Sequence, residues 1–242
     1  MPNERKTRVG KAYPDRVEVR GRDLAGELMG RLSFTEYFHL LLTGTRPTEE
    51  QRFFLDLVLV AIAEHGLMPS SVAARMTLAA DPDSVQGAVA AGILGAGPVV
   101  LGTSEECARL LESDEEPLRL ARAIHGAGGK VPGFGHPVHR PVDPRAERIL
   151  ELADEHGVSG RYVRRARALR DAVSEVWGKP LTMNVAMPMA AVMLDLGFPF
   201  AAVKAVPILA RTAGLLAHLA EEREQPLGLV LARAAEEVVE YE

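Results

Sequence analysis

The chain has 242 residues, of which 47% are hydrophobic and 25% are charged, and its formal net charge is −5. This composition is typical of a soluble globular protein with one large domain or two small ones. The negative charge argues against a general nucleic-acid binder, which usually carries a basic surface. The single cysteine, Cys107, excludes a disulfide framework and a multi-cysteine metal site, and it favours a reducing cytoplasm.

The ends and the apolar runs of the chain predict no targeting segment and no membrane span. The first residues, MPNERKTRVGK, are charged and no apolar segment follows them. The longest apolar runs are interrupted by proline or charge before they reach the length of a bilayer span. Aromatic residues make up only 5% of the chain, whereas Ala, Leu, Val and Arg dominate, which favours helices over sheets.

After a start that is typical of a small hairpin or an extended arm (TRVGKAYPDRVEVRG), apolar residues recur at helical spacing nearly throughout. Polar residues before these segments predict helix caps. The expected caps are Ser33 or Thr35, a capping box that begins at Thr48, Ser70 or Ser71, Asp83 or Ser84, Ser104, Asp143 and Ser159. The expected helices, in chain order, cover residues 23–29, 34–44, 48–64, 72–80, 85–97, 104–116, 117–129, 144–156, 160–178, 185–197, 200–224 and 227–242.

These elements predict an all-α fold with essentially no strands. The intervals between helices that end at glycine vary, which argues against a helical solenoid of the HEAT type. The chain has no low-complexity linker. A second domain would therefore be an insertion within the chain.

Residues 129–145, GKVPGFGHPVHRPVDPR, are typical neither of a helix nor of an alternating strand. Gly133 and Gly135 allow a ligand to approach the main chain closely, where bare N–H groups can contact it. His136 follows in a stiff loop, ready to donate a hydrogen bond or to move a proton near neutral pH. Asp143 and Arg145 open a helix, where the positive end of the dipole and a guanidinium suit a carboxylate. The loop predicts an anion site beside a proton-transfer group.

Two other interpretations of this loop stay open. Its histidines can simply cap helices within a turn. His136 and His139 can also bind a metal, but no third ligand lies near them in the sequence, and we expect no metal site.

Several segments resemble the citrate synthase superfamily. PGFGHPVHRPVDPRA resembles its GxGHxV…DPR signature, and most of all that of the short citryl-CoA lyase branch, which is related to the cleavage module at the end of ATP-citrate lyase. Four more segments resemble family segments in the family's order and extend the likeness over nearly the whole chain. They are residues 19–51, 61–75 (AIAEHGLMPSSVAAR), 179–185 (KPLTMNV) and 209–224 (LARTAGLLAHLAEERE).

The resemblance implies a large all-helical domain with a smaller inserted helical domain, in a homodimer with its sites in the domain cleft. Here residues 1–103 and 197–242 would form the large domain and residues 104–196 the small one. The implied activity is that of a citryl-CoA lyase or citrate synthase, which cleaves or forms a C–C bond between acetyl-CoA and oxaloacetate through a citryl-CoA-type intermediate. Coenzyme A would enter as a thioester substrate, with a small carboxylate as its partner and no permanently bound cofactor.

The resemblance also assigns roles to residues. His65 and His136 match the two histidines that hold and protonate the oxygen of the 2-oxo acid. Arg145 and Arg211 match arginines that pair with substrate carboxylates. A polycarboxylate needs several guanidinium groups, each of which binds one carboxylate through two hydrogen bonds. The developing alkoxide likewise needs positioned donors. The loop that contacts coenzyme A is matched by Lys130, Val131, Pro132, Gly133, Phe134 and Gly135.

Two departures from the family pattern affect the expected chemistry. Ala186 stands where the family has the aspartate that removes a proton from the acyl methyl group or returns one in cleavage. The segment 97–103, GPVVLGT, lacks the histidine that synthases carry there, as do relatives in the lyase branch. The usual C-terminal Arg-Pro-Arg is also not evident.

Ala186 favours two alternatives to the family activity. One is a catalytically impaired homologue that binds coenzyme A or carboxylates as a regulatory or scaffold protein. The other is an enzyme for a different acyl-CoA. Asp195, nine positions after Ala186, is expected to be structural, and Glu64 beside His65 is expected to point elsewhere along its helix. Cys107 is expected to be buried and inert.

Overall fold

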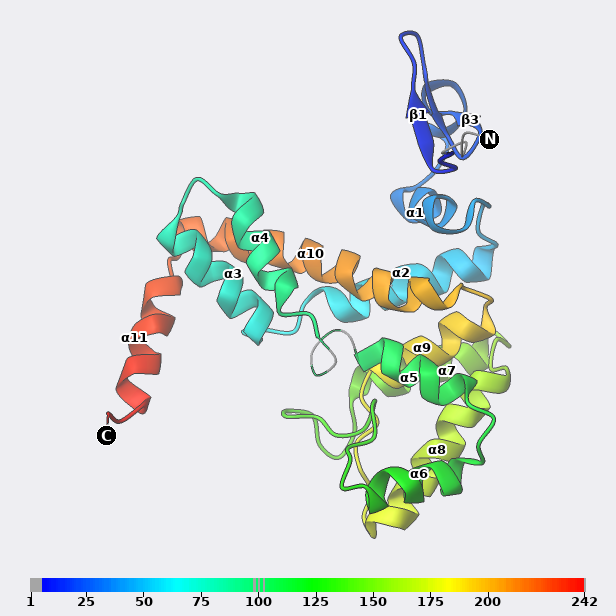
Figure 1. Cartoon of the computed structure of the whole chain (residues 1–242). Helices are drawn as coiled ribbons and strands as arrows, with labels where there is room; N and C mark the ends of the chain where they lie inside the picture. The colour runs from blue at the N-terminus through cyan, green and yellow to red at the C-terminus, as the bar shows by residue number, and fades with distance from the viewer. Residues whose placement is uncertain (1–5, 98, 100, 102, 242) are drawn as a thin grey trace, which may run out of the picture. The chain divides into compact units, whose positions relative to one another are not determined.

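The computed structural model describes residues 6–97, 99, 101 and 103–241 (Figure 1). These residues form two compact units, one up to Asp56 and one from Leu57 onward. The division into a large domain and an inserted small domain over residues 104–196 stays a prediction.

The first unit begins with a small antiparallel sheet in the order β1-β2-β3. Lys11 lies opposite Glu18 in its first ladder. The hairpin expected at the start of the chain is therefore present, whereas the expectation of essentially no strands missed the third strand. Each strand has only two or three residues, too few for an alternating pattern to register. The strands are β1 (Gly10–Ala12), β2 (Val17–Val19) and β3 (Arg22–Asp23).

Helices complete the first unit around a core of Val19, Leu28 and Leu40. A short π-helix, η1 (Leu24–Leu28), follows the sheet and is capped by Asp23. The helix α1 (Phe34–Thr43) begins at Ser33 with a full capping box. The helix α2 (Glu49–Ala63) crosses the boundary between the units, and Thr48 and Gln51 form the expected capping box at its start.

The rest of the second unit is helical as far as the structure describes it, which confirms the all-α class. The helix α9 is its centre, because every residue from Ala186 to Leu194 is buried, and it packs against α5, α7 and α8. The helices are α3 (Pro69–Ala80), α4 (Val85–Leu94), α5 (Thr103–Glu112), α6 (Pro117–Gly126), α7 (Pro144–Glu155), α8 (Arg161–Trp177), α9 (Ala186–Asp195), α10 (Phe200–Glu224) and α11 (Gly228–Val238).

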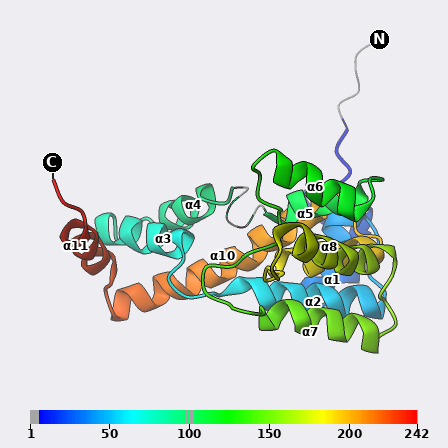
Figure 2. The same ribbon diagram turned by 90° about the horizontal axis from the view of Figure 1, so that it is seen from below.

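The long helix α10 joins two groups of helices in this unit (Figures 1 and 2). The α5 side chain of Ser104 donates to the carbonyl of Val203 near one end of α10. Near the other end, Gly92 of α4 lies so close to Leu215 that a Cβ atom would meet its side chain at 2.6 Å. By length and composition α10 alone among the described helices passes as a membrane span. Its packing against α3, α4, α5 and α9 makes it a core helix here.

Three expected serine caps are wrong, for two different reasons. The helix α3 begins at Pro69, so Ser70 and Ser71 lie inside it. The helix α5 begins at Thr103, which puts Ser104 inside it as well. Ser159 donates to Asp154 instead of capping α8. In α3 and α5 the helix starts before the serine, whereas at Ser159 another side chain competes for the hydroxyl.

Candidate active site

A cavity of about 640 Å³ opens within the second unit. It is lined by the segment after α2 and by the starts of α7 and α9, together with part of the loop before α7 and the middle of α10. The structure brings six of the predicted site residues to this one cavity, and their positions span nearly 150 residues of sequence. They are His65, Gly135, His136, Arg145, Ala186 and Arg211.

The predicted coenzyme A loop reaches this cavity only at Gly135. Val131 is part of a buried hydrophobic cluster with Ala121, Ala172 and Val173, and Phe134 packs against this cluster. Lys130 is exposed. The role of residues 130–134 in binding coenzyme A stays a prediction.

Two glycines give the loop its path. Gly133 and Gly135 have φ angles of +82° and +89°, a region that favours glycine. A Cβ atom on Gly133 would lie 2.8 Å from the Sγ of Cys107. Cys107 is fully buried, as expected, and burial raises the pKa of its thiol. The loop is tied to the segment before α9, because Gly135 donates to the carbonyl of Thr182 at 2.7 Å.

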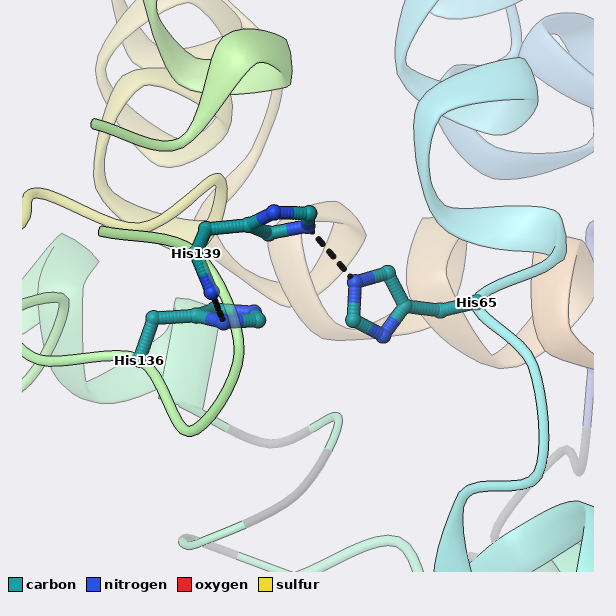
Figure 3. Close-up of side chains that lie close together, drawn as sticks. All are labelled: His65, His136 and His139. Atoms are coloured by element: carbon teal, nitrogen blue, oxygen red, sulfur yellow. Dashed lines mark hydrogen bonds between the residues drawn. The ribbon is translucent and has the colours of Figure 1, made fainter. Parts of the chain in front are cut away.

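The imidazole rings of His65, His136 and His139 lie close together beside this loop (Figure 3). The Nε2 atoms of His65 and His139 are 3.0 Å apart and share a hydrogen bond. The Nδ1 atom of His136 accepts the backbone N–H of Val138 at 3.1 Å and that of His139 at 2.8 Å. A neutral His136 must therefore carry its proton on Nε2, where it acts only as a donor.

The surroundings favour the neutral form of His65 and His136. Burial lowers the pKa of His65 below its ordinary 6.5, and the charges of Arg145, His136 and His139 lower it further, against an opposing effect of Asp143. Burial and the charge of His139 likewise lower the pKa of His136. Near neutral pH His65 can therefore accept a proton, whereas His136 can only donate one from Nε2.

The same three histidines have the spacing of a metal site, because one nitrogen from each lies within 4.8 Å of the others. The sequence offered no third ligand because His65 is 74 positions from His139. The protonation of His136 does not fit this use. A histidine ligand normally binds with Nε2 while its Nδ1–H donates, whereas Nδ1 of His136 accepts two bonds. The Arg145 Nη2 atom also lies 3.4 Å from Nε2 of His136, so the site suits an anion better than a cation.

Arg145 is held by a buried carboxylate. Asp143 has no exposed surface, and its oxygens accept from Nε of Arg145 at 3.0 Å and from Nη2 at 2.9 Å. The Asp143 Oδ2 atom also accepts the backbone N–H of Val185 at 3.1 Å. Asp143 therefore caps α7, as expected, and in addition fixes Arg145 and the start of α9, which the sequence did not indicate.

Arg211 differs from Arg145 because it has no such partner. It is 5% exposed, and its Nε and Nη1 atoms are buried without a hydrogen bond. Burial lowers the pKa of its guanidinium; nearby Glu64 opposes the shift, and Arg145 adds to it. A buried guanidinium without a partner is unfavourable in free energy. The side chain lines the cavity and is complementary to a carboxylate ligand.

A family model described as "Citrate synthase, C-terminal domain" matches residues 9–233. The chain belongs to the citrate synthase family. The all-α prediction with a citrate synthase-like fold and the resemblance to this superfamily are confirmed.

Among solved structures, a citryl-CoA lyase from Hydrogenobacter thermophilus is similar to this chain, with a TM-score of 0.83 and 29% identity over 91% of this chain and 87% of that one. An ATP citrate lyase from Methanothrix soehngenii, in complex with citrate and coenzyme A, has a TM-score of 0.80 at 18% identity, over 93% of this chain and 39% of that one. This second likeness shows the fold alone.

Among curated relatives, the citrate synthase of Saccharolobus solfataricus is 27% identical over 87% of this chain and 58% of its own length. The chain spans about half the length of the curated relatives that it matches.

The described lining of this cavity holds no carboxylate. Ala186 lies at the cavity wall at the start of α9, and no Asp or Glu is among the described residues that line the cavity. Of the second departure, the segment 97–103, Pro98, Val100 and Gly102 lie outside the described residues, whereas Val99 and Leu101 line the cavity.

Neither nearby acid replaces the missing carboxylate directly. Glu64 accepts the N–H of Gly66, and its Oε2 lies 2.9 Å from Nε2 of His218, so it points away from the cavity lining as expected. It ends a buried chain of polar contacts. His218 Nδ1 accepts from Nη2 of Arg75 at 2.9 Å, and Arg75 donates from Nη1 to Glu222 at 2.8 Å. This chain supports the turn that carries His65.

The structure confirms the structural reading of Asp195 and identifies its partner. Its oxygens accept the backbone N–H groups of Gly160, Tyr162 and Val163 at 2.8–3.0 Å. Asp195 therefore caps the first turn of α8, which lies more than 30 positions away in the chain.

Replacing Asp195 with alanine is expected to lower the free energy of unfolding by about 2 kcal/mol, because α8 loses the acceptor for its first turn. Ligand binding in the cavity should not change. Urea unfolding and calorimetric titration with citrate measure the two quantities. A variant of unchanged stability that no longer binds citrate would contradict the capping role.

Anion binding should be linked to proton uptake at His65. An anion beside Arg145 offsets the positive charge that holds the pKa of His65 down, so this pKa rises on binding. The complex then binds more protons than the free protein, and affinity increases as the pH falls from 7 toward 6. Oxaloacetate is the suitable probe because its carboxyl groups stay ionised in this range. Calorimetry in buffers of different ionisation enthalpy counts the protons, and proton release would contradict the assignment.

Proposed function

We propose that this protein cleaves or forms the C–C bond of a hydroxy-polycarboxyl-CoA thioester, in the manner of citryl-CoA lyase or citrate synthase. The reactants on one side would be an acyl-CoA such as acetyl-CoA and a 2-oxo acid such as oxaloacetate, with a citryl-CoA-type intermediate. The observation that carries the proposal is the buried guanidinium of Arg211, whose Nε and Nη1 atoms have no hydrogen-bond partner. It lines the same cavity as His65, His136 and Arg145.

The residues that line the cavity, and those of the loop beside it, would have distinct roles in the reaction. Arg211 and Arg145 would orient carboxylates, since a guanidinium binds a carboxylate through two parallel bonds. His136 would donate from Nε2 to the carbonyl or alkoxide oxygen, because its Nδ1 is occupied by two backbone donors. Residues Lys130–Gly135 would bind coenzyme A, which takes part as a substrate and not as a resident cofactor.

The names of similar proteins support this choice of substrates. The likeness to a citryl-CoA lyase extends over most of both chains. The ATP citrate lyase of the same fold was solved with citrate and coenzyme A.

A second candidate function is favoured by Ala186. A homologue without the family carboxylate can retain the pocket and bind coenzyme A or carboxylates as a regulatory or scaffold protein. Loss of a general base costs about 10²–10⁴-fold in rate, so slow turnover or turnover of another acyl-CoA is the alternative to no turnover.

A coupled assay and a titration separate these candidates. Purified protein is incubated with citryl-CoA, and release of oxaloacetate is followed with malate dehydrogenase while acetyl-CoA is measured by chromatography. Release of both products at a rate proportional to protein supports the lyase. Calorimetric binding of coenzyme A and citrate without any product supports the binding protein, and a gain of citrate formation in the Ala186→Asp variant would show that the rest of the site is competent.

We further propose that the protein works as a cytoplasmic homodimer, with neither nucleic acid nor membrane as a partner, and that residues 104–196 form the smaller domain. Light scattering during size-exclusion chromatography tests the dimer, for which a monomer at all concentrations is the contrary result.

A further inference from the structure

The proposed reaction needs a group that moves protons, and this inference rests on that proposed function. Cleavage takes a proton from a tertiary hydroxyl and returns one to a carbon. The family's carboxylate is absent at Ala186, and no other carboxylate belongs to the described lining of the cavity. The oxygens of Asp143 are engaged by Arg145 and Val185.

His136 is not suited to accept that proton. Its Nδ1 atom is occupied by the N–H groups of Val138 and His139. Its Nε2 atom carries the proton and faces Arg145 Nη2 at 3.4 Å. His136 is thus a donor toward oxygen and not a base.

His65 and His139 form the pair that remains. Their Nε2 atoms are 3.0 Å apart (Figure 3), so one nitrogen must hold a proton while the other offers its lone pair. The loop fixes His139 on both sides, because its N–H donates to His136 and its carbonyl accepts from Oγ1 of Thr182 at 3.3 Å. His65 lines the cavity.

We propose that His65 is the proton-transfer residue of this cavity and that His139 is its proton partner, the two imidazoles together replacing the carboxylate missing at Ala186. His65 contacts the substrate in this scheme. His139 acts through His65 and is a positioning residue that also stores a proton.

The proton balance of cleavage is closed by this pair. The tertiary hydroxyl gives its proton to His65, and the proton between the rings moves along the Nε2···Nε2 bond to His139. The O–H electron pair forms the new C=O bond, and the electrons of the broken C–C bond pass to the thioester enolate. The pair then returns one proton to the enolate carbon, which yields the 2-oxo acid and the acetyl thioester. No electron donor or acceptor is required.

The surroundings of His65 favour its basic form, because burial and the charges of Arg145, His136 and His139 outweigh Asp143 there. Arg145 and Asp143 act from the start of α7 and the two histidines from the loop. Arg211 of α10 lies near Arg145 and Glu64. Cleavage should therefore speed up as the pH rises through the titration of His65, and then level off.

Variants of His139 test this role. In His139→Gln the amide can still hydrogen-bond to His65 but cannot take a proton, whereas His139→Ala provides neither function. We expect kcat for citryl-CoA cleavage to fall about 10²-fold or more in both variants, with the rise of rate with pH lost and with the Kd for citrate within about twofold of wild type. His125→Gln is the matched control and should behave as wild type, because His125 is an exposed residue of α6 that contacts Trp177 of α8.

Three other results would overturn the inference. An active wild type in which His139→Gln keeps kcat and the pH profile, while only His139→Ala is impaired, shows that His139 merely holds His65 in place. Activity that is lost in EDTA and restored by Zn²⁺ shows that the imidazoles hold a metal instead. A wild-type protein that cleaves no thioester removes the proposed function and this inference with it, a result distinct from an active enzyme that is insensitive to His139.

Discussion

Replacing Arg211 with methionine is expected to stabilise the free protein and to weaken carboxylate binding at the same time. In the free protein the buried Nε and Nη1 atoms have no acceptor, and such an uncompensated group costs about 1–3 kcal/mol. Methionine fills a similar volume without that cost. With ligand present the same guanidinium gains its partner, and truncating one member of such a pair costs about 2–5 kcal/mol. The Kd for citrate should therefore rise by roughly 100-fold.

Thermal unfolding with and without citrate measures both effects on one sample. The melting temperature of Arg211→Met should exceed that of wild type without citrate and should respond only to citrate concentrations about 100-fold higher. Arg223→Met is the matched control, since Arg223 lies exposed on the same helix, α10. If Arg211→Met binds citrate as wild type does, the carboxylate site lies elsewhere.

Replacing Asp143 with asparagine should have the largest effect on folding. Removing one partner of a buried ion pair costs about 3–5 kcal/mol. The full figure is an upper bound here, because Asp143 is buried but Arg145, which is left without its counter-charge, is 21% exposed. The N–H of Val185 at the start of α9 also loses its charged acceptor. Asp154→Asn is the control, because its ion pair with Arg167 is largely exposed and should contribute about 1 kcal/mol or less.

The loss in Asp143→Asn should depend on pH in a defined direction. Burial raises the pKa of Asp143, but the hydrogen bonds and charge of Arg145 outweigh burial and hold this pKa below its ordinary 3.8. A carboxyl group whose pKa is lowered by folding contributes stability above its unfolded pKa and loses it as the pH falls through the folded value. The difference between variant and wild type should thus be constant from pH 5 to 7 and shrink below about pH 4. A difference that grows in acid would contradict the ion pair.

The local part of the site was predictable from sequence because its residues are neighbours in the chain. Gly135, His136, Asp143 and Arg145 lie within eleven positions, and their turn and cap chemistry can be read directly. The partner of His139 could not be predicted in this way. His65 lies 74 positions away, and only the packed fold brings the two rings together.

The caps at the helix starts show the same difference between local and distant partners. Ser33 and Thr48 cap their helices because the partners lie three residues on. The start of α8 is instead capped by Asp195 from α9, a distant carboxylate that provides three acceptor contacts where Ser159 could offer one. The lack of hydrogen-bond partners at the guanidinium of Arg211 is likewise a property of its tertiary surroundings. The arginine itself was predicted from the family pattern.

The most direct test of the account is a crystal structure of the protein with citrate and coenzyme A. The account predicts a citrate carboxylate within about 2.7–3.2 Å of Nε or Nη1 of Arg211, a citrate oxygen facing Nε2 of His136, and coenzyme A along residues 130–135. Citrate bound on another surface, with the guanidinium of Arg211 still unpaired, would contradict it.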